Sequence, residues 1–575
     1  MKIIIGINTY HADSSACILI DGNLIAAIEE ERINRKKHFS GYPIESIKEC
    51  LRIANKKDYE ITDIAFNTKP TSNLIKKIFF FLKNLSFKNN QSIKRFNKKM
   101  KIKEVLFNEF KLNKNINFHF IEHHLAHIAS AFYPSEFNHA NGLSIDGSGD
   151  FVTFALATCK ENKIKINKKI YFPNSLGIFY HAMTQFLGYK NYGDEYKIMG
   201  LAAYGKPKYF DKIRNELFIE NYEDLFKLNL KYFNHHKKNF RYIADNSLVI
   251  DAIFNSKLNK LFFNDLKISK NKDEFDQDFA ASVQKVYEYY FKKIIDRICT
   301  NNFSDNLVFA GGCALNSSAN KILTDNNELF KNVYIPFAPG DNGGALGAAF
   351  IVSARYNNVI QNSQNPYLGS DFSNEEIKEI LNQNFYDNKL KYELITDEKK
   401  LLKLTAKLIS EGNVIGWFQG KMEFGPRALG NRSILADPRN PNMKKIINKK
   451  IKRRESYRPF APSVLKKHQY EWFESKFTNP YMSSVATVKA KKKKLIPAVT
   501  HIDGTARLQS VNPFFNKKYN DLIEEFYSLT NVPILLNTSF NENEPIVMKP
   551  EESINCLLRT DMDAVIINNF YVTKI

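Results

Sequence analysis

Three histidines within five positions are the first residues of this sequence whose spacing could hold a metal ion. They lie in the stretch IEHHLAHIASAF, residues 121–132. The residues before them are typical of a strand and those after them of a helix. A helix would place His123 and His127 on one face because they are four positions apart, and two such imidazoles can supply nitrogen ligands to one metal. His124 would point elsewhere, and we expect it to be a surface or capping residue rather than a ligand.

Two aspartates are the candidate partners of these histidines. Asp146 ends a predicted strand shortly after them, and Asp341 stands in PGDNGG, at a predicted turn from strand to helix. Two imidazoles and two carboxylates make a mixed nitrogen and oxygen site that suits iron(II), manganese or zinc. Each aspartate alone could instead be a turn former or a helix N-cap. The prediction therefore depends on the four residues meeting.

Two glycine-rich turns follow predicted strands. GGCALN, residues 311–316, would let the backbone approach a ligand closely. PGDNGG, residues 339–344, could present backbone N–H groups to a phosphate at the start of a helix. Neither turn matches a Walker A or a Rossmann fingerprint. Tight turns that need glycine would explain each of them equally well.

A second set of candidate residues is basic and lies towards the C-terminus. The segment GKMEFGPRALGNRSILADPR, residues 420–439, holds Arg427, Arg432 and Arg439 among glycines. Arginine forks grip phosphate through paired hydrogen bonds. A solvated helix face would explain the lysines at 444–450 but not arginines interleaved with Gly-Pro and Leu-Gly. The pattern indicates an anion site, and the lack of interleaved aromatic side chains counts against single-stranded nucleic acid.

The elements that must position these residues show an internal duplication. Predicted strands at 2–6, 15–20 and 23–29 form a strand, a polar loop and a hairpin with Asp21-Gly22 at its turn. The same order returns from 142 to 168, and a long helix at 277–301 then leads to the strand NLVFA and a strand at 333–337. Such a duplicated unit resembles the actin, hexokinase and Hsp70-like fold. We predict an α/β protein with an actin/hexokinase-like duplicated N-terminal domain.

Length and composition bound the number of domains. A chain of 575 residues exceeds one ordinary core, so two domains are expected. Asn, Gln, Ser, Pro and Gly cluster at 354–373, which predicts domains at 1–356 and 367–575, with a helix that opens at Ser373. Residues 72–110, with an amphipathic helical pattern, and residues 208–275 have the character of insertions.

Charge and cysteine content bound the class of protein. The chain carries 83 basic and 61 acidic residues, a formal net charge of +22, which attracts anions, although the abundance of Lys, Asn, Ile and Phe also suits an A/T-rich genome. Six scattered cysteines without a CxxC pair fit a reducing cytosol. Without a signal peptide pattern or a bilayer-length apolar run, we expect a cytoplasmic protein with no membrane span.

At this point the sequence resembles a known family. The motifs that carry the resemblance are YHADSSA, EHHLAH, IDGSGD, GDEYKIMGLAAYG, GGCALN, PGDNGGALGAA, MEFGPRALGNRSILADPR, YRPFAPS and LLNTSFN. In this order they are similar to the O-carbamoyltransferases that modify nodulation factors, cephamycins and aminoglycosides. The resemblance covers nearly the whole chain and is least at the two insertions.

The resemblance implies a two-domain enzyme. The N-terminal domain would be similar to the tRNA threonylcarbamoyl transferase of the actin-like superfamily, and the C-terminal domain would be YrdC-like. The C-terminal domain would make carbamoyl-adenylate from carbamoyl phosphate and ATP with Mg²⁺, releasing pyrophosphate and phosphate. The N-terminal domain would then move the carbamoyl group to a substrate hydroxyl, and AMP would leave.

The resemblance also implies a role for each candidate residue. Iron(II) would be held by His123, His127, Asp146 and Asp341. His11 matches the general base of the transfer step, although this chain reads HADSS where the family more usually reads HDAS. Residues implied to hold adenosine are Gly311, Gly312 and Asn316. Residues implied for the carbamoyl phosphate and ATP pocket are Arg427, Arg432, Lys452, Arg458, Arg507, Asn537 and Ser539.

The acceptor and the partners stay open at this stage. A small-molecule or glycan hydroxyl, on a sugar or a sugar-containing metabolite, is the expected acceptor, with no nucleic acid partner. A fused threonylcarbamoyl-type tRNA-modifying enzyme is the alternative, and a non-catalytic nucleotide-binding regulator is a third reading. A homodimer is the default expectation for the assembly.

Overall fold

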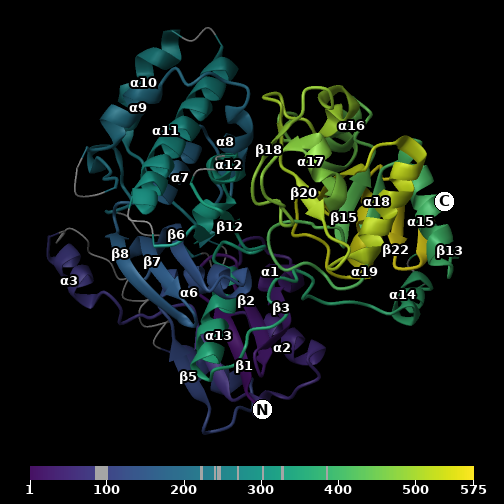
Figure 1. The fold of residues 1–575 in the computed structure, drawn as a ribbon, viewed down its shortest axis with the longest axis horizontal. Helices are drawn as coiled ribbons and strands as arrows, with labels where there is room; N and C mark the ends of the chain where they lie inside the picture. Colours follow the sequence, from purple (N-terminus) through teal and green to yellow (C-terminus); the bar gives the residue numbers. More distant parts are fainter. Residues whose placement is uncertain are drawn as a thin grey trace. The chain divides into compact units, whose positions relative to one another are not determined.

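The chain was analysed as a computed structural model, which describes residues 1–83, 101–220, 225–237, 241–242, 248–268, 271–300, 303–325, 329–383, 386 and 388–575. It divides into two compact units. The N-terminal unit comprises residues 1–31 and 37–364, and the C-terminal unit comprises 32–36 and 365–575 (Figure 1). The predicted insertion at 72–110 contributes helices α3 (Leu74–Lys83) and α5 (Ile102–Glu109), and its residues 84–100 lie outside the described part.

Two five-stranded sheets form the frame of the N-terminal unit. Their strand orders are β3-β2-β1-β4-β5 and β8-β7-β6-β11-β12. The strands of the first sheet are β1 (Ile3–Asn8), β2 (Ser15–Ile20), β3 (Asn23–Glu29), β4 (Asp63–Phe66) and β5 (Asn117–Phe120). Those of the second sheet are β6 (His139–Gly149), β7 (Val152–Lys160), β8 (Lys163–Tyr171), β11 (Asn306–Ala310) and β12 (Asn332–Tyr334).

The two sheets repeat one topology. In each, the first three strands in chain order pair antiparallel as hairpins, and the fourth and fifth strands add in parallel beside the first. The predicted duplication is therefore confirmed. The predicted strand at 333–337 is shorter in the structure, because β12 ends at Tyr334.

Two helices pack on each other and on these sheets. Helix α13 (Gly343–Arg355) packs on β1 and β2, and α6 (His123–Phe132) packs on β6 and β11. Gly347 allows this approach, because a Cβ there would lie 1.8 Å from the Ala126 carbonyl oxygen. Both helices begin beside the strand ends, so the residues at their N-termini come together.

The remaining helices of this unit cluster around α11 (Lys272–Thr300), which starts five residues before the predicted 277. Helices α7 (Leu176–Phe186), α8 (Glu195–Ala202), α9 (Phe210–Leu217), α10 (Ser256–Ile268) and α12 (Ser317–Asp325) contact it. The short helix α2 (Ile44–Ile53) and the strand pair β9 (Arg241–Tyr242) and β10 (Leu248–Val249) also belong to this unit. The short helix α1 (Glu30–Asn34) includes the residues at which the two units divide.

An eight-stranded mixed sheet forms the core of the C-terminal unit, in the order β13-β23-β22-β14-β15-β21-β16-β20. These strands are β13 (Leu390–Leu394), β23 (Phe570–Lys574), β22 (Ala564–Ile567), β14 (Ile415–Phe418), β15 (Arg432–Ala436), β21 (Ile534–Ser539), β16 (Ala461–Leu465) and β20 (Gln509–Val511). A small sheet of β17 (Phe473–Glu474), β18 (Ala486–Val488) and β19 (Thr505–Ala506) accompanies it.

The helices of the C-terminal unit are α14 (Asn374–Leu381), α15 (Glu398–Ser410), α16 (Met443–Ile447), α17 (Gln469–Trp472), α18 (Lys517–Thr530) and α19 (Pro550–Arg559). Ser373 caps α14, accepting a hydrogen bond from the Glu376 N–H in a capping box, so the predicted helix start is confirmed. No described helix in either unit has the length and apolar character needed to cross a bilayer.

Candidate functional site

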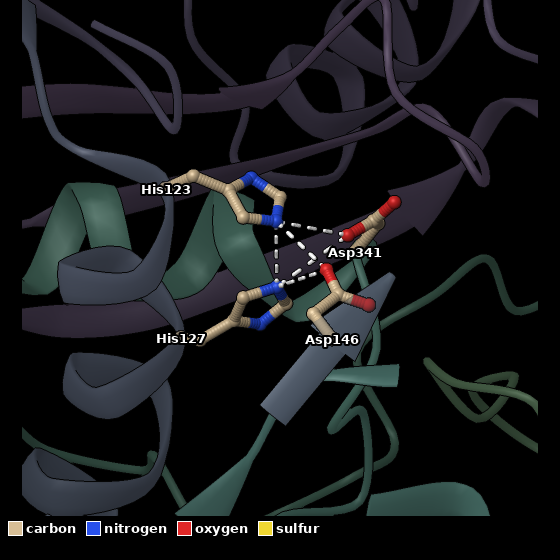
Figure 2. Close-up of side chains that lie close together, drawn as sticks. All are labelled: His123, His127, Asp146 and Asp341. Atoms are coloured by element: carbon tan, nitrogen blue, oxygen red, sulfur yellow. Dashed lines mark hydrogen bonds and ion pairs between the residues drawn. The ribbon is translucent and has the colours of Figure 1, made fainter. Parts of the chain in front are cut away.

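Four side chains converge in the N-terminal unit (Figure 2). The Nε2 atom of His123 lies 3.0 Å from Asp146 Oδ2 and 3.3 Å from Asp341 Oδ1. The Nε2 atom of His127 lies 3.4 Å from each of the same oxygens. The two Nε2 atoms are 3.0 Å apart. The four residues that the sequence brings from distant segments therefore meet at one point.

These separations fit a common metal ion. Bonds of about 2.1 Å at tetrahedral or octahedral angles place ligand atoms roughly 3.0–3.4 Å apart. Both imidazoles are fully buried, and each turns Nε2 rather than Nδ1 to the centre. The Oδ1 atom of Asp341 is buried and accepts no hydrogen bond from the described residues, although two nitrogens face it. This donor set fits a divalent cation.

The electrostatics of the four residues also favour a bound cation. Burial alone would raise the pKa of Asp146, but hydrogen bonds and charge from His123 and His127 hold it well below its usual range. Burial opposes protonation of His123, yet Asp146 and Asp341 raise its pKa to about 10. The buried Asp146 and the half-buried Asp341 thus favour positive charge at this point, which a metal dication can also supply.

Local structure explains how the ligands are placed. Helix α6 begins at His123, whose N–H donates to Asp150 Oδ2 at 3.1 Å. Asp146 lies within β6, at an irregularity in its pairing with β7, rather than at the strand end as predicted. Asp341 precedes α13. Gly149 leaves room for the first ligand, because a Cβ there would lie 1.9 Å from the His123 ring.

His124 takes no part in this cluster. Its Nδ1 faces Ser144 Oγ at 2.8 Å and its Nε2 faces the Val152 carbonyl oxygen at 2.9 Å. Burial lowers its pKa to about 3, so it is a neutral core residue. The prediction of a surface or capping residue was wrong, because the neighbouring strands β6 and β7 cover this face of the helix.

His11, the predicted general base, lies beside the metal cluster. Its ring stacks on the ring of His123, with centroids 4.5 Å apart and planes inclined by 22°. It is buried, at 8% exposed. The loop after β1 therefore brings His11 into direct contact with the cluster of two histidines and two aspartates.

The predicted nucleotide residues adjoin the cluster on another side. The Gly312 N–H donates to Asp146 Oδ1 at 3.2 Å. Gly311 has a φ of +98°, and a Cβ there would lie 2.3 Å from the Ile145 carbonyl oxygen. Glycine is therefore required where this turn crosses the end of the central strand.

Two residues near Asn316 had not been predicted. Asn316 exchanges hydrogen bonds with Gln284, whose amide also donates to Glu288 at 2.9 Å. Both partners lie on the long helix α11, and burial raises the pKa of Glu288. Only their helical periodicity marks them in the sequence, and that pattern reads as core.

A second group of metal-ligand types, Asp13, Glu31 and His38, also gathers in the N-terminal unit. His38 Nδ1 lies 2.8 Å from Asp13 Oδ1, and the His38 N–H donates to Glu31 Oε2 at 2.8 Å. The other ring nitrogen packs against Gly193, where a Cβ would lie 2.4 Å away. This group is an ion pair whose imidazole is already engaged.

Guanidinium groups gather in the C-terminal unit. The charges of Arg427, Arg454 and Arg458 act, after burial, to lower the pKa of Arg507 well below its usual range. Burial lowers the pKa of Arg427 to about 10. The Nε atom of Arg507 is buried and has no hydrogen-bond partner among the described residues. Arg454, which had not been predicted as a site residue, donates to Asn448 Oδ1 and covers the Phe460 ring.

The four arginines are half-buried. Like charges gathered in this way favour an anion as partner, because arginine forks suit phosphate oxygens. Glu455 lies 3.6 Å from Arg458 as an ion-pair partner. We refer to Arg427, Arg454, Arg458 and Arg507 as the arginine cluster.

Three further predicted residues lie on β21 or contact the chain at its end. Lys452 is buried, and its Nζ donates to the Ser539 and Asn541 carbonyl oxygens at 2.6 Å each. The Asn537 amide donates to the Ala428 carbonyl oxygen at 3.2 Å, next to Arg427, and its Oδ1 is buried without a partner. Asn537 therefore adjoins the arginine cluster, whereas the Lys452 ammonium ties down the chain after β21.

Arg432, also predicted for the phosphate pocket, does not belong to the arginine cluster. Its fork donates to the carbonyl oxygens of Gln419, Asn431 and Ser370 at 2.7–3.0 Å, and it stacks on Phe418 at 3.6 Å. The side chain is fully buried on β15. Its two terminal nitrogens thus donate to backbone oxygens, whereas its Nε is buried without a partner among the described residues, and we leave Arg432 out of the candidate anion site.

Comparison with known proteins identifies the family. The sequence model of the carbamoyltransferase N-terminus matches residues 3–350, and that of the carbamoyltransferase C-terminus matches residues 406–574. The chain therefore belongs to the carbamoyltransferase family, and the predicted resemblance is confirmed.

Individual relatives cover most of the chain. An uncharacterized protein of Synechocystis sp. is 37% identical over 100% of this chain and 97% of its own. Nodulation protein NolNO of Sinorhizobium fredii is 34% identical over 99% of this chain and 80% of its own. Nodulation protein NolO of Bradyrhizobium diazoefficiens is 37% identical over 79% of each chain.

Proposed function

We propose that this chain is an ATP-dependent O-carbamoyltransferase that acts on a hydroxyl of a sugar or sugar-containing metabolite. The observation that carries the proposal is the pairing of two sites within one carbamoyltransferase-family chain. One is the arginine cluster, whose half-buried charges and unpartnered Arg507 Nε favour an anion. The other is the cluster of two histidines and two aspartates beside His11.

The C-terminal unit, in the proposed YrdC-like role, makes carbamoyl-adenylate. Carbamoyl phosphate and water give carbamate and phosphate. An oxygen of carbamate then attacks the α-phosphorus of ATP, and pyrophosphate leaves with Mg²⁺. Arg427, Arg458 and Arg507 bind the phosphate groups, and Asn537 holds the carbamoyl end through its unpartnered Oδ1. Lys452 and Ser539 shape the pocket floor. Enclosure protects the adenylate from water.

The N-terminal unit, in the proposed actin-like role, transfers the carbamoyl group. Gly311, Gly312 and Asn316 hold the adenosine part. Iron(II), or another divalent ion, held by His123, His127, Asp146 and Asp341 would supply positive charge to the adenylate phosphate. His11 accepts the proton of the acceptor hydroxyl as its oxygen bonds to the carbamoyl carbon. The C–O bond to phosphate breaks, and AMP leaves.

The proposed acceptor is supported by the relatives of this chain, since no sequence motif indicates it. Two of them are nodulation proteins, and the resemblance to enzymes that carbamoylate nodulation factors supports a sugar hydroxyl. A tRNA-modifying activity is not favoured, because both halves of the chain match carbamoyltransferase models. The proposal keeps the cytoplasm as location and a homodimer as default assembly.

The test measures the products of ATP. The full chain is incubated with ATP, Mg²⁺ and carbamoyl phosphate, and AMP and pyrophosphate are quantified with and without carbamoyl phosphate. We expect pyrophosphate only when carbamoyl phosphate is present. Cleavage of ATP to ADP alone, or pyrophosphate release that needs tRNA, would contradict the proposal.

A further inference from the structure

A histidine beside the arginine cluster has a buried nitrogen with no partner. His501 lies in a tight turn, in which its N–H donates to the Thr505 carbonyl oxygen at 2.8 Å and the Gly504 N–H returns to the His501 carbonyl oxygen at 2.9 Å. Its Nε2 atom is buried and makes no hydrogen bond with the described residues. Buried polar atoms are normally paired, so this nitrogen needs an explanation.

The hydrogen bonds around His501 determine which ring nitrogen carries the proton. The Thr505 hydroxyl donates to Asp503 Oδ1 at 2.8 Å, and the Thr505 N–H donates to the same oxygen at 2.9 Å. A hydroxyl has one proton to give. Thr505 Oγ1 must therefore accept from His501 Nδ1, 3.1 Å away. In the neutral ring the proton is on Nδ1, and Nε2 presents a lone pair.

The surrounding charges keep the ring neutral. Burial lowers the pKa of His501, Asp503 acts in the opposite direction, and Arg507 and Lys444 lower it further. A neutral imidazole with a free lone pair is a base at neutral pH.

His501 and Arg507 lie near each other around the short strand β19. Arg507 directly follows this strand, two positions after Thr505, to which His501 is hydrogen-bonded. The charge of Arg507 acts on the His501 ring, as expected for neighbouring groups. Arg507 Nε is a buried donor without a partner, and His501 Nε2 is a buried acceptor without one.

Arg507 Nε and His501 Nε2 each match one reactant of a hydrolysis. An anion oxygen would satisfy the guanidinium, and a water molecule would satisfy the imidazole by donating to it. The proposed function, on which this inference rests, consumes one water for each carbamoyl phosphate.

We propose that His501 is the general base that activates this water. As the water oxygen bonds to the carbonyl carbon of carbamoyl phosphate, His501 Nε2 takes one of its protons. The C–O bond to phosphate breaks, and phosphate leaves with the electron pair, stabilised by the arginine cluster. The imidazolium then returns the proton to phosphate. The products are carbamic acid, which ionises to carbamate, and hydrogen phosphate. Thr505 and Asp503 are positioning residues that fix the tautomer.

The first experiment supplies carbamate, the product of the proposed step, so that the step itself is no longer needed. In His501→Asn the amide can still donate to Thr505, but the base at Nε2 is lost. With carbamoyl phosphate, release of phosphate and of pyrophosphate should fall by about 10²-fold or more. Ammonium bicarbonate solutions contain carbamate, and adding one should restore pyrophosphate release from ATP to the level of the wild type.

Several outcomes would overturn the assignment. Unchanged phosphate release in His501→Asn means that His501 is not the base. Loss of pyrophosphate release with both carbamoyl phosphate and ammonium bicarbonate means a structural role. In water labelled with ¹⁸O, label in the released phosphate would show attack at phosphorus instead. A wild-type chain with no pyrophosphate release under any of these conditions contradicts the proposed function itself, which separates the two failures.

A second variant tests the positioning residues. Thr505→Val removes the hydroxyl that accepts from Nδ1–H and keeps the shape of the side chain. We expect slower phosphate release that ammonium bicarbonate also bypasses, with the KM for carbamoyl phosphate unchanged. A raised KM with unchanged kcat would show that the turn only shapes the binding pocket.

Discussion

The ring of His11 stacks on the ring of His123, with centroids 4.5 Å apart. One residue is the proposed base and the other a proposed metal ligand, so this contact joins the two halves of the proposed transfer chemistry. It connects the loop after β1 to the first residue of α6.

The contact predicts that His11→Ala separates the two partial reactions. Transfer to an acceptor should fall by about 10²–10⁴-fold because the proton acceptor is lost. Pyrophosphate release, which is proposed to take place in the C-terminal unit, should continue. Both are measured on the same sample, with His139→Ala, an exposed histidine on β6, as control. Transfer at the wild-type rate in His11→Ala would remove it as the base.

Metal content should depend on the two histidines of α6 that share a face. The double variant His123→Ala, His127→Ala leaves only two carboxylate ligands, so bound metal should fall to background in elemental analysis. His139→Ala should retain it. The variant His124→Ala is a poor control, because His124 is buried with two hydrogen bonds and its loss threatens folding. Retained metal in the double variant would refute the site.

A glycine offers a test that changes no ligand. A Cβ at Gly149 would lie 1.9 Å from the His123 ring, so Gly149→Ala must displace that ligand. We expect clearly reduced metal content. Gly147→Ala is the matched control on the same strand, β6, because a Cβ there meets nothing within 4 Å. Equal metal content in the two variants would show that His123 is not held where the structure places it.

Arg507 and Arg432 should respond in opposite ways to the same substitution. Arg507→Gln removes one of several half-buried like charges, so the protein without ligand should be no less stable, while the rise in Tm on adding pyrophosphate should shrink. Arg432→Gln leaves buried carbonyl oxygens without donors and should cost roughly 3 kcal/mol. Thermal denaturation with and without pyrophosphate measures both. An undiminished rise in Arg507→Gln would place the anion elsewhere.

The free energy of unfolding at acidic pH should depend on His235. Burial lowers its pKa to about 4, against a hydrogen bond to the Pro173 carbonyl oxygen at 2.9 Å that acts in the other direction. As pH falls from about 6.5 towards 4, the unfolded chain takes up a proton that the folded chain does not. The free energy of unfolding therefore falls, by at most about 1.4 kcal/mol per pH unit from this group.

His235→Gln removes this titration while its amide can still donate to Pro173. Urea unfolding at pH 7 and pH 5 should show a smaller difference in the variant than in the wild type. An equal difference would mean that His235 takes up its proton in the folded state too.

The sequence alone determined the local elements and the periodic patterns. The strands Ser15–Ile20 and Asn23–Glu29 have the predicted bounds because two short apolar runs and the Asp-Gly turn between them act locally. The helix at His123 and its four-residue spacing follow from the same short-range rules. Motif order was enough to predict the family, which the family models confirm.

Only the tertiary structure decided which residues face one another. Arg427 and Arg432 stand in the same motif, yet one lies in the arginine cluster and the other binds backbone carbonyl oxygens, because strand pairing turns them to different surroundings. His124 proved to be buried because strands distant in sequence cover it. His501 carries no motif that marks it, and its free nitrogen follows from the hydrogen bonds of one turn. Spacing along a chain fixes which side chains share an element, but the long-range packing of elements fixes what each side chain meets.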